Sequence, residues 1–169
     1  NFGSMAEFLS GNSLARKVSV EEALAILHQT EEAGLVHCAD NTTDRPGKIC
    51  NCCPCCCLFL KGLLELGNPH AVAASSYRAC VDERQCTGCG ICHEERCRVG
   101  AITPADGKVR IDAERCIGCG QCAGHCPAGA IALKKREMPV DTPPTSKDMA
   151  VKVLTEKSKL EAFMEVMAR

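Results

Sequence analysis

Apolar residues near the start of the chain recur at the spacing of a helix. Residues 23–27 place alanine and leucine on one helical face, and Ser19 with Glu22 forms a capping-box pattern ahead of them. Gly34 suits the left-handed position that follows a helix. We therefore predict a helix over residues 20–33.

A second apolar stripe at helical spacing lies near the end of the chain. Its members are Leu160, Phe163, Met164 and Met167. The stripe predicts a single helix over residues 146–167, after the proline-rich residues 141–145. Such a stripe most often packs within its own chain, and contact with a partner protein or a second copy is the alternative.

The middle of the chain carries signals for a loop and a shorter helix. Residues 40–47 are turn-forming throughout and predict a loop. Pro54 suits the first position of a helix, and Gly67 with Pro69 is a stop signal. These signals predict a helix over residues 54–66.

Four short apolar segments around residue 100 predict strands. Residues 77–82 and 108–112 each lead into a cysteine motif, and residues 101–103 and 130–133 each follow one. The strings VDERQC and IDAERC mark the same position in the two halves. Each half therefore reads strand, cysteine loop, short helical turn, strand, and we expect the halves to be related by a pseudo-two-fold axis.

The number of cysteines changes the picture from a conventional domain to a metal-bound one. The chain has 16 cysteines in 169 residues, a level typical of disulfide-linked or metal-bound scaffolds. We find no charged-then-apolar secretion signal, so we expect metal ligation in a reducing cytoplasm. Residues 1–4, ahead of Met5, are interpreted as the remnant of an expression tag.

Charge and composition argue against several other kinds of function. A net charge of -1 does not suit a nucleic-acid-binding face. The longest apolar run, residues 58–66, is too short to span a membrane and contains Lys61 and Glu65. The chain offers no phosphate-binding glycine loop and no nicotinamide or flavin fingerprint. With four Phe, one Tyr and no Trp, it is also poorly suited to a large organic cofactor.

Two related cysteine motifs carry most of the functional information. The first is CTGCGIC at residues 86–92, followed by Cys97, and the second is CIGCGQC at residues 116–122, followed by Cys126. Residues 80–134 resemble the bacterial-type ferredoxins that carry two [4Fe–4S] clusters, because the second motif matches their C-x2-C-x2-C-x3-C-P run without a gap.

The resemblance implies both a fold and a crossed set of cluster ligands. The expected fold class is α+β, a pseudo-two-fold (βαβ)2 ferredoxin-like cluster domain with a helical N-terminal extension and a C-terminal helix. One cluster would be held by Cys86, Cys89, Cys92 and Cys126. The other would be held by Cys116, Cys119, Cys122 and Cys97. Glycines within the motifs would let backbone N–H groups point at the cluster sulfurs.

The first motif departs from the ferredoxin pattern. Four residues, HEER, separate Cys92 from Cys97 where three are usual, and Arg98 stands in place of the proline. We expect altered hydrogen bonding around the cluster that Cys97 completes, and a three-iron cluster or a missing ligand stays open. Arg96 and Arg98 are interpreted as solvated charges, with a docking patch as the alternative.

A separate cysteine-rich segment, CNCCPCCC at residues 50–57, precedes these motifs. If Cys53 caps a helix beginning at Pro54, three of its cysteines share one helical face. We predict a third iron–sulfur site, with zinc or free thiols as alternatives. Its predicted ligands are Cys50, Cys53, Cys56 and Cys57. Other cysteines that could take part are Cys52, Cys55, Cys38 and Cys80.

These observations predict an electron carrier rather than an enzyme. The chain would relay single low-potential electrons through two [4Fe–4S] clusters to a redox partner protein. Residues 50–57 resemble cysteine-rich runs that precede ferredoxin repeats in proteins of anaerobic microbes, and this resemblance implies architecture rather than chemistry. The alternative is a reductase subunit whose catalytic centre is the cysteine-rich site. The expected domains are a helical segment with the cysteine-rich loop over residues 5–79, a two-cluster domain over 80–136, and a linker with the C-terminal helix over 137–169.

Overall fold

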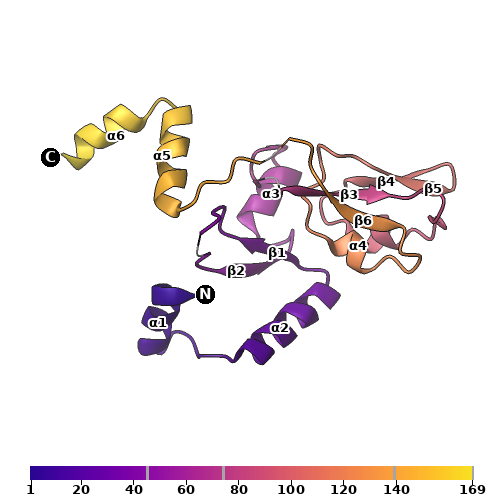
Figure 1. Cartoon of the computed structure of the whole chain (residues 1–169), viewed down its shortest axis with the longest axis horizontal. Helices are drawn as coiled ribbons and strands as arrows, with labels where there is room; N and C mark the ends of the chain where they lie inside the picture. The colour runs from indigo at the N-terminus through magenta and orange to yellow at the C-terminus, as the bar shows by residue number, and fades with distance from the viewer. Residues whose placement is uncertain (45, 74, 139, 169) are drawn as a thin grey trace. The chain divides into compact units, whose positions relative to one another are not determined.

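The computed structural model describes residues 1–44, 46–73, 75–138 and 140–168 of the chain. Helices and small two-stranded sheets alternate along it, which confirms the α+β class (Figure 1). The chain divides into two compact units. Unit 1 contains residues 1–17, 39–49 and 141–169, and unit 2 contains residues 18–38 and 50–140.

Unit 1 contains a helix that the sequence pattern did not predict. This helix, α1, spans Gly3–Gly11, and the backbone N–H of Phe2 before it donates a hydrogen bond to the Gly47 carbonyl at 2.8 Å. Gly3 and Ser4 are thus part of a helix, and their interpretation as a tag remnant stays a prediction.

The helix predicted over residues 146–167 is two helices, α5 (Ser146–Glu156) and α6 (Leu160–Met167), which Figure 1 shows as separate coils. The prediction of one helix was wrong because the backbone reverses at Ser158, whose φ is 53°. There the N–H of Lys159 donates to the Leu154 carbonyl at 2.8 Å, the bond that closes a Schellman motif. The apolar stripe of α6 therefore does not continue into α5, because the break lies just before Leu160.

Unit 2 begins with α2 (Val20–Glu32), which confirms the first predicted helix. The Ser19 side chain accepts a hydrogen bond from the Glu22 N–H at 3.1 Å, as the capping pattern indicates. Gly34 ends the helix with a φ of 74°, and the Leu35 N–H bonds back to the Thr30 carbonyl at 3.0 Å.

Two short strands that were not predicted follow α2. They are β1 (Val36–Ala39) and β2 (Ile49–Cys52), and they form a two-stranded sheet. The predicted loop over residues 40–47 joins them, although its residue 45 lies outside the described residues.

The next helix, α3 (Leu58–Leu64), is shorter than the predicted helix over residues 54–66. The cysteines before it form turns, and the residue that caps the helix is Cys57, with an extended backbone, rather than Cys53. The Cys57 N–H instead closes a tight turn onto the Cys53 carbonyl at 3.0 Å. The expectation that Cys53, Cys56 and Cys57 share one helical face was therefore wrong.

The cysteine motifs lie within four strands and two short helical turns. In chain order these are β3 (Tyr77–Val81), η1 (Cys92–Arg96), β4 (Ile102–Ala105), β5 (Lys108–Ile111), α4 (Gln121–Gly124) and β6 (Ile131–Lys135). β3 pairs antiparallel with β6, so that Tyr77 lies opposite Lys135. β4 pairs antiparallel with β5, so that Ile102 lies opposite Ile111. All four predicted strands are present.

The core of unit 2 is made of small side chains and cysteines. Val36 and Leu60 are the largest side chains with less than 2% of their surface exposed among the described residues. Around them the buried residues are mostly alanine, valine and isoleucine, together with Cys92, Cys116 and Cys122. Within the described part of the chain, no helix is both long and apolar enough to cross a membrane.

Candidate metal centres

The loop after β3 and the turn after α4 contribute cysteines to one pocket. This first cysteine pocket is lined by Cys86, Cys89, Cys92 and Cys126, with Val109 and Ile131 among the apolar residues beside them. Burial raises the pKa of Cys92, and the nearby thiols of Cys89 and Cys126 raise it further. Like charges that lie near one another disfavour ionisation in this way, so the thiols of this pocket are electrostatic neighbours.

The loop after β5 forms a second pocket with a cysteine of the first motif. This second cysteine pocket is lined by Cys97, Cys116, Cys119 and Cys122. Burial, followed by the neighbouring thiols of Cys119 and Cys116, raises the pKa of Cys122 to about 12. In the absence of metal the Cys122 thiol is therefore protonated at neutral pH, and metal binding would have to displace its proton.

Backbone N–H groups point at two sulfurs of the second cysteine pocket. The Ala79 N–H lies 3.4 Å from the Cys116 sulfur, and the Ala101 N–H lies 3.1 Å from the Cys97 sulfur. Ala79 belongs to β3 and Ala101 directly precedes β4, so the strands hold these donors in place. Such donors stabilise negative charge on a ligand sulfur.

Glycines allow each cysteine loop to approach the backbone beside it. Gly88 and Gly118 have φ values of 70° and 71°, in the region that favours glycine. A Cβ atom on Gly88 would collide with the carbonyl oxygen of Gly107, and one on Gly118 would collide with that of Tyr77. The two loops are therefore built in the same way.

The extra residue of the first motif is absorbed as a wider helical turn. η1 is a π-helical turn, in which the Cys97 N–H donates to the Cys92 carbonyl, five residues earlier, at 2.9 Å. The corresponding α4 of the second motif is an ordinary α-helical turn. A one-residue insertion commonly takes this form, often at functional sites. Cys97 still lines the second cysteine pocket.

The two arginines of the first motif bind the end of α2. Arg96 donates from Nη1 to the Glu32 carbonyl at 3.0 Å, and Arg98 donates from Nε to the Gly34 carbonyl at 2.9 Å. Their interpretation as solvated charges was wrong. The signal that could have found them is the end of α2 itself, because the last carbonyls of a helix lack partners and attract cations.

Two residues of the second motif bind the same segment. Gln121 is 3% exposed and donates from Nε2 to the Leu35 carbonyl at 2.8 Å. His125, whose side chain is 12% exposed, lies with Nε2 3.3 Å from Glu32 Oε1. Nothing in the sequence pattern singled out Gln121, because a single glutamine in a loop is an ordinary surface residue.

The cysteines of residues 50–57 do not form one cluster. The sulfurs of Cys53, Cys55 and Cys56, here called the outer thiol group, all lie within 4.8 Å of one another. Those of Cys55 and Cys56 are 3.7 Å apart. Cys55 and Cys56 are exposed and Cys53 is half-buried. Two of the predicted ligands, Cys53 and Cys56, thus come together, and Cys55 joins them.

Other cysteines of this region face inward. Cys38, Cys52 and Cys57, here called the inner thiol group, pack against the buried core of unit 2. The Cys52 thiol contacts those of Cys57 and Cys38, and burial raises its pKa to about 12. Of the remaining predicted and alternative ligands, Cys50 lies in β2 and Cys80 in β3.

Two thiols of the outer group, Cys53 and Cys55, differ in the direction in which their pKa is shifted. Hydrogen bonds from the Cys55 and Cys56 thiols lower the pKa of Cys53. Hydrogen bonds with Cys53 and Cys56 raise the pKa of Cys55 to about 11. Because a thiolate rather than a thiol binds metal, the Cys53 sulfur is available to an ion at lower pH than the Cys55 sulfur.

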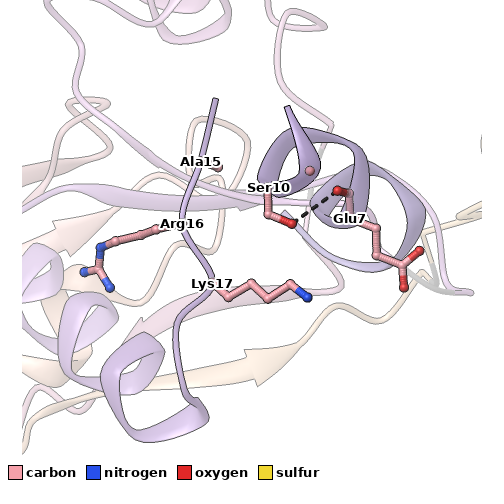
Figure 2. A pocket seen from close by; sticks show the side chains of 6 residues that line it. Glu7, Ser10, Ala15, Arg16 and Lys17 are labelled. Atoms are coloured by element: carbon pink, nitrogen blue, oxygen red, sulfur yellow. Dashed lines mark hydrogen bonds between the residues drawn. The ribbon is translucent and has the colours of Figure 1, made fainter. Parts of the chain in front are cut away.

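A further hollow lies in unit 1, which contains no cysteine. It is lined by Glu7, Ser10, Gly11, Ala15, Arg16 and Lys17. Figure 2 shows Ser10 on α1, where its Oγ donates to the Glu7 carbonyl at 3.2 Å, with Arg16 and Lys17 extending from the following segment. The hollow contains none of the predicted site residues.

Comparison with known families supports part of this picture. Residues 109–132 match the family described as a 4Fe-4S binding domain. The match covers the second cysteine motif with parts of β5 and β6, so it supports iron–sulfur cluster binding by a ferredoxin-type domain. The first motif and residues 50–57 lie outside the match. No curated protein matches the chain.

Proposed function

We propose that this chain is an iron–sulfur electron-transfer module that relays single low-potential electrons through two [4Fe–4S] clusters. A [4Fe–4S] cluster supplies a one-electron redox couple when it is bound. In this proposal residues 80–136 form a (βαβ)2 domain of the bacterial-type two-cluster ferredoxins. The pairing of β3 with β6 and of β4 with β5 supports it.

The observation that carries the proposal is the grouping of eight cysteines into two pockets of four. Cys126, from the second motif, lines the pocket of the first motif, and Cys97 lines the pocket of the second. This exchange is what the crossed ligand set of the ferredoxin resemblance requires. The proposed ligands are Cys86, Cys89, Cys92 and Cys126 for one cluster and Cys97, Cys116, Cys119 and Cys122 for the other.

The chain's own groups would tune the second site toward reduction. The N–H donors of Ala79 and Ala101 lie against the sulfurs of Cys116 and Cys97. Added negative charge on these sulfurs is stabilised by such donors, which raises the reduction potential.

The proposal extends to the surroundings of the two clusters. A third metal–sulfur site in residues 50–57 is part of the proposal, and the close spacing of the outer thiol group supports it.

The proposed partner is a redox protein, and the proposed setting is a reducing, anaerobic cytoplasm, in which thiols stay available for iron. The exposed apolar residues of α6, such as Met164 and Met167, are offered for contact with a second copy.

Iron and sulfide analysis of anaerobically purified protein tests the two-cluster proposal. We expect about eight irons in the ferredoxin-type sites and a near-equal amount of sulfide per chain. The variant Cys119→Ala should lose about half of this iron, whereas Cys80→Ala, which alters a strand cysteine outside both pockets, should keep it. About four irons or fewer in wild-type protein with intact thiols would contradict the proposal.

A further inference from the structure

We propose that the outer thiol group, Cys53, Cys55 and Cys56, binds a single thiophilic metal ion with one coordination position open to solvent. This deepens the third site of the proposed function, because it names the ligands and replaces a cluster with one ion. The inference rests on the proposed function in one respect: the iron of the protein is taken to be bound in the two cysteine pockets and not in the outer thiol group.

The spacing of the three sulfurs suits one ion. A tetrahedral ion with metal–sulfur bonds of about 2.3 Å holds its sulfurs about 3.8 Å apart. The Cys55 and Cys56 sulfurs are 3.7 Å apart, and all three lie within 4.8 Å of one another. A four-iron cube binds each thiolate at a different iron, so its ligand sulfurs are spread more widely.

The contrast with the two cysteine pockets supports this distinction. Among the described residues, the outer thiol group is the one set of three cysteine, histidine or carboxylate ligand atoms found at this close spacing. The eight cysteines that line the two pockets, all among the described residues, form no set of three sulfurs at this close spacing. The same chain thus offers two kinds of sulfur site that differ in the spacing of their sulfurs.

The backbone holds the outer thiol group in position without metal. The N–H groups of Cys56 and Cys57 both donate to the Cys53 carbonyl, at 3.4 and 3.0 Å. Pro54 fixes its own φ between the first two ligands. This turn aims the three sulfurs to one side, whereas the Cys57 thiol joins the inner thiol group and packs on the core.

The exposure of the site leaves a position for an external ligand. Cys55 and Cys56 are exposed, and no fourth ligand atom within the described part of the chain joins the group at the same spacing. Zinc sites with three protein ligands keep their fourth position for water or another molecule, and thiolates select soft ions such as Zn²⁺ and Cu⁺. Each thiol that binds releases its proton to solvent.

Zinc titration of anaerobic protein that keeps its clusters tests the inference. We expect about one Zn²⁺ per chain without loss of iron, and X-ray absorption at the zinc edge should show about three sulfurs near 2.3 Å and no metal neighbour. Cys55→Ala should weaken Zn²⁺ binding about tenfold or more. Removing a residue that only hydrogen-bonds to a metal ligand already weakens metal affinity by about that factor, and Cys55 is itself a ligand in this inference. Cys50→Ala, the matched control in the same segment, should bind Zn²⁺ like wild type.

The opposite result for the two variants would overturn the inference. Weaker binding in Cys50→Ala but not in Cys55→Ala would assign the site to the wider, cluster-like set, and a metal neighbour in the absorption spectrum would do the same. Failure to bind Zn²⁺ while about eight irons are present would reject the site and leave the relay standing. Zinc bound as expected in protein with about four irons or fewer would reject the relay and leave the site standing.

Discussion

Glycine at positions 88 and 118 decides how closely each cysteine loop approaches the backbone next to it. At both positions the φ angle is positive and a side chain would meet a carbonyl oxygen. Each glycine therefore meets two requirements: its backbone is left-handed, and its lack of a side chain lets a neighbouring carbonyl oxygen come close. The second requirement concerns residues such as Tyr77 that are distant in the sequence.

Replacing Gly118 with alanine should separate these two requirements. We expect Gly118→Ala to lower the free energy of unfolding by about 2–4 kcal/mol, from backbone strain and from overlap with the Tyr77 carbonyl. Gly129→Ala is the control, because Gly129 has a φ of 60° but nothing within 4 Å of its added Cβ. Denaturant unfolding under anaerobic conditions measures both. Equal losses would contradict the close approach to Tyr77.

The thiols of the outer group should react in the order of their acidity. In protein freed of metal, Cys53 has a lowered pKa and Cys55 one raised to about 11. At a given pH more Cys53 is thiolate, so it should be alkylated several times faster than Cys55 near neutral pH, and Cys55 should become reactive only as the pH rises toward its pKa. Mass spectrometry after limited alkylation locates the label. Equal labelling near neutral pH would contradict the hydrogen-bonded arrangement.

At the scale of elements, the end of α2 is joined to both cysteine motifs. Arg96 and Arg98 bind carbonyls of the segment from the first motif, and Gln121 binds it from the second. Arg96 is the last residue of the π-helical turn η1, which accommodates the extra residue of the first motif. The unusual spacing of the first motif is thereby connected with attachment of the helical extension.

Removing the Arg98 side chain should loosen this attachment. Arg98→Ala takes away the donor to the Gly34 carbonyl, and a hydrogen bond from a charged group is worth about 1.5–3 kcal/mol. We expect the amides of Leu35 and Val36 to exchange hydrogen about tenfold faster or more. Arg84→Ala, which changes an exposed arginine beside the first motif, is the control. Unchanged exchange in Arg98→Ala would show that the contact does not hold α2.

Local signals predicted α2 and the four strands because each contained its own start, stop or alternation. The capping residue Ser19 and the terminal Gly34 fixed both ends of α2. The break at Ser158 was missed because serine is uncommon in the left-handed region, and the position of α3 was missed because Pro54 suits a turn as well as a helix. The grouping of Cys55 with Cys53 depends on that turn, so it could not be inferred from spacing alone.

At the scale of the whole molecule, unit 2 has few large side chains in its interior. Cys92, Cys116 and Cys122 occupy part of its core, where burial raises the pKa of Cys92 and Cys122. We expect a domain with so thin a core to depend on bound metal for much of its stability. Unit 1, with α1, α5 and α6, contains none of the proposed cluster ligands.

Chelation of iron should therefore affect the two units differently. We expect the unfolding midpoint of unit 2 to fall by roughly 10 °C or more, since about 1 kcal/mol shifts a small domain by 4–8 °C. Amide exchange in β3 and β6 should accelerate, while exchange in α5 stays the same and serves as the internal control. Unchanged protection of β3 and β6 after complete iron loss would contradict the dependence on metal.

The pairing of β3 with β6 brings the first and last residues of the cysteine-bearing segment side by side, with Tyr77 opposite Lys135. The two ends of residues 77–135 therefore lie next to each other, so that a short linker could join them. A circular permutant could join these two ends by a short linker and open the chain instead at Asp106 and Gly107, between β4 and β5, without altering the order of residues inside either cysteine loop. Such a segment is also suited to insertion into a host protein, since both of its junctions leave from one edge.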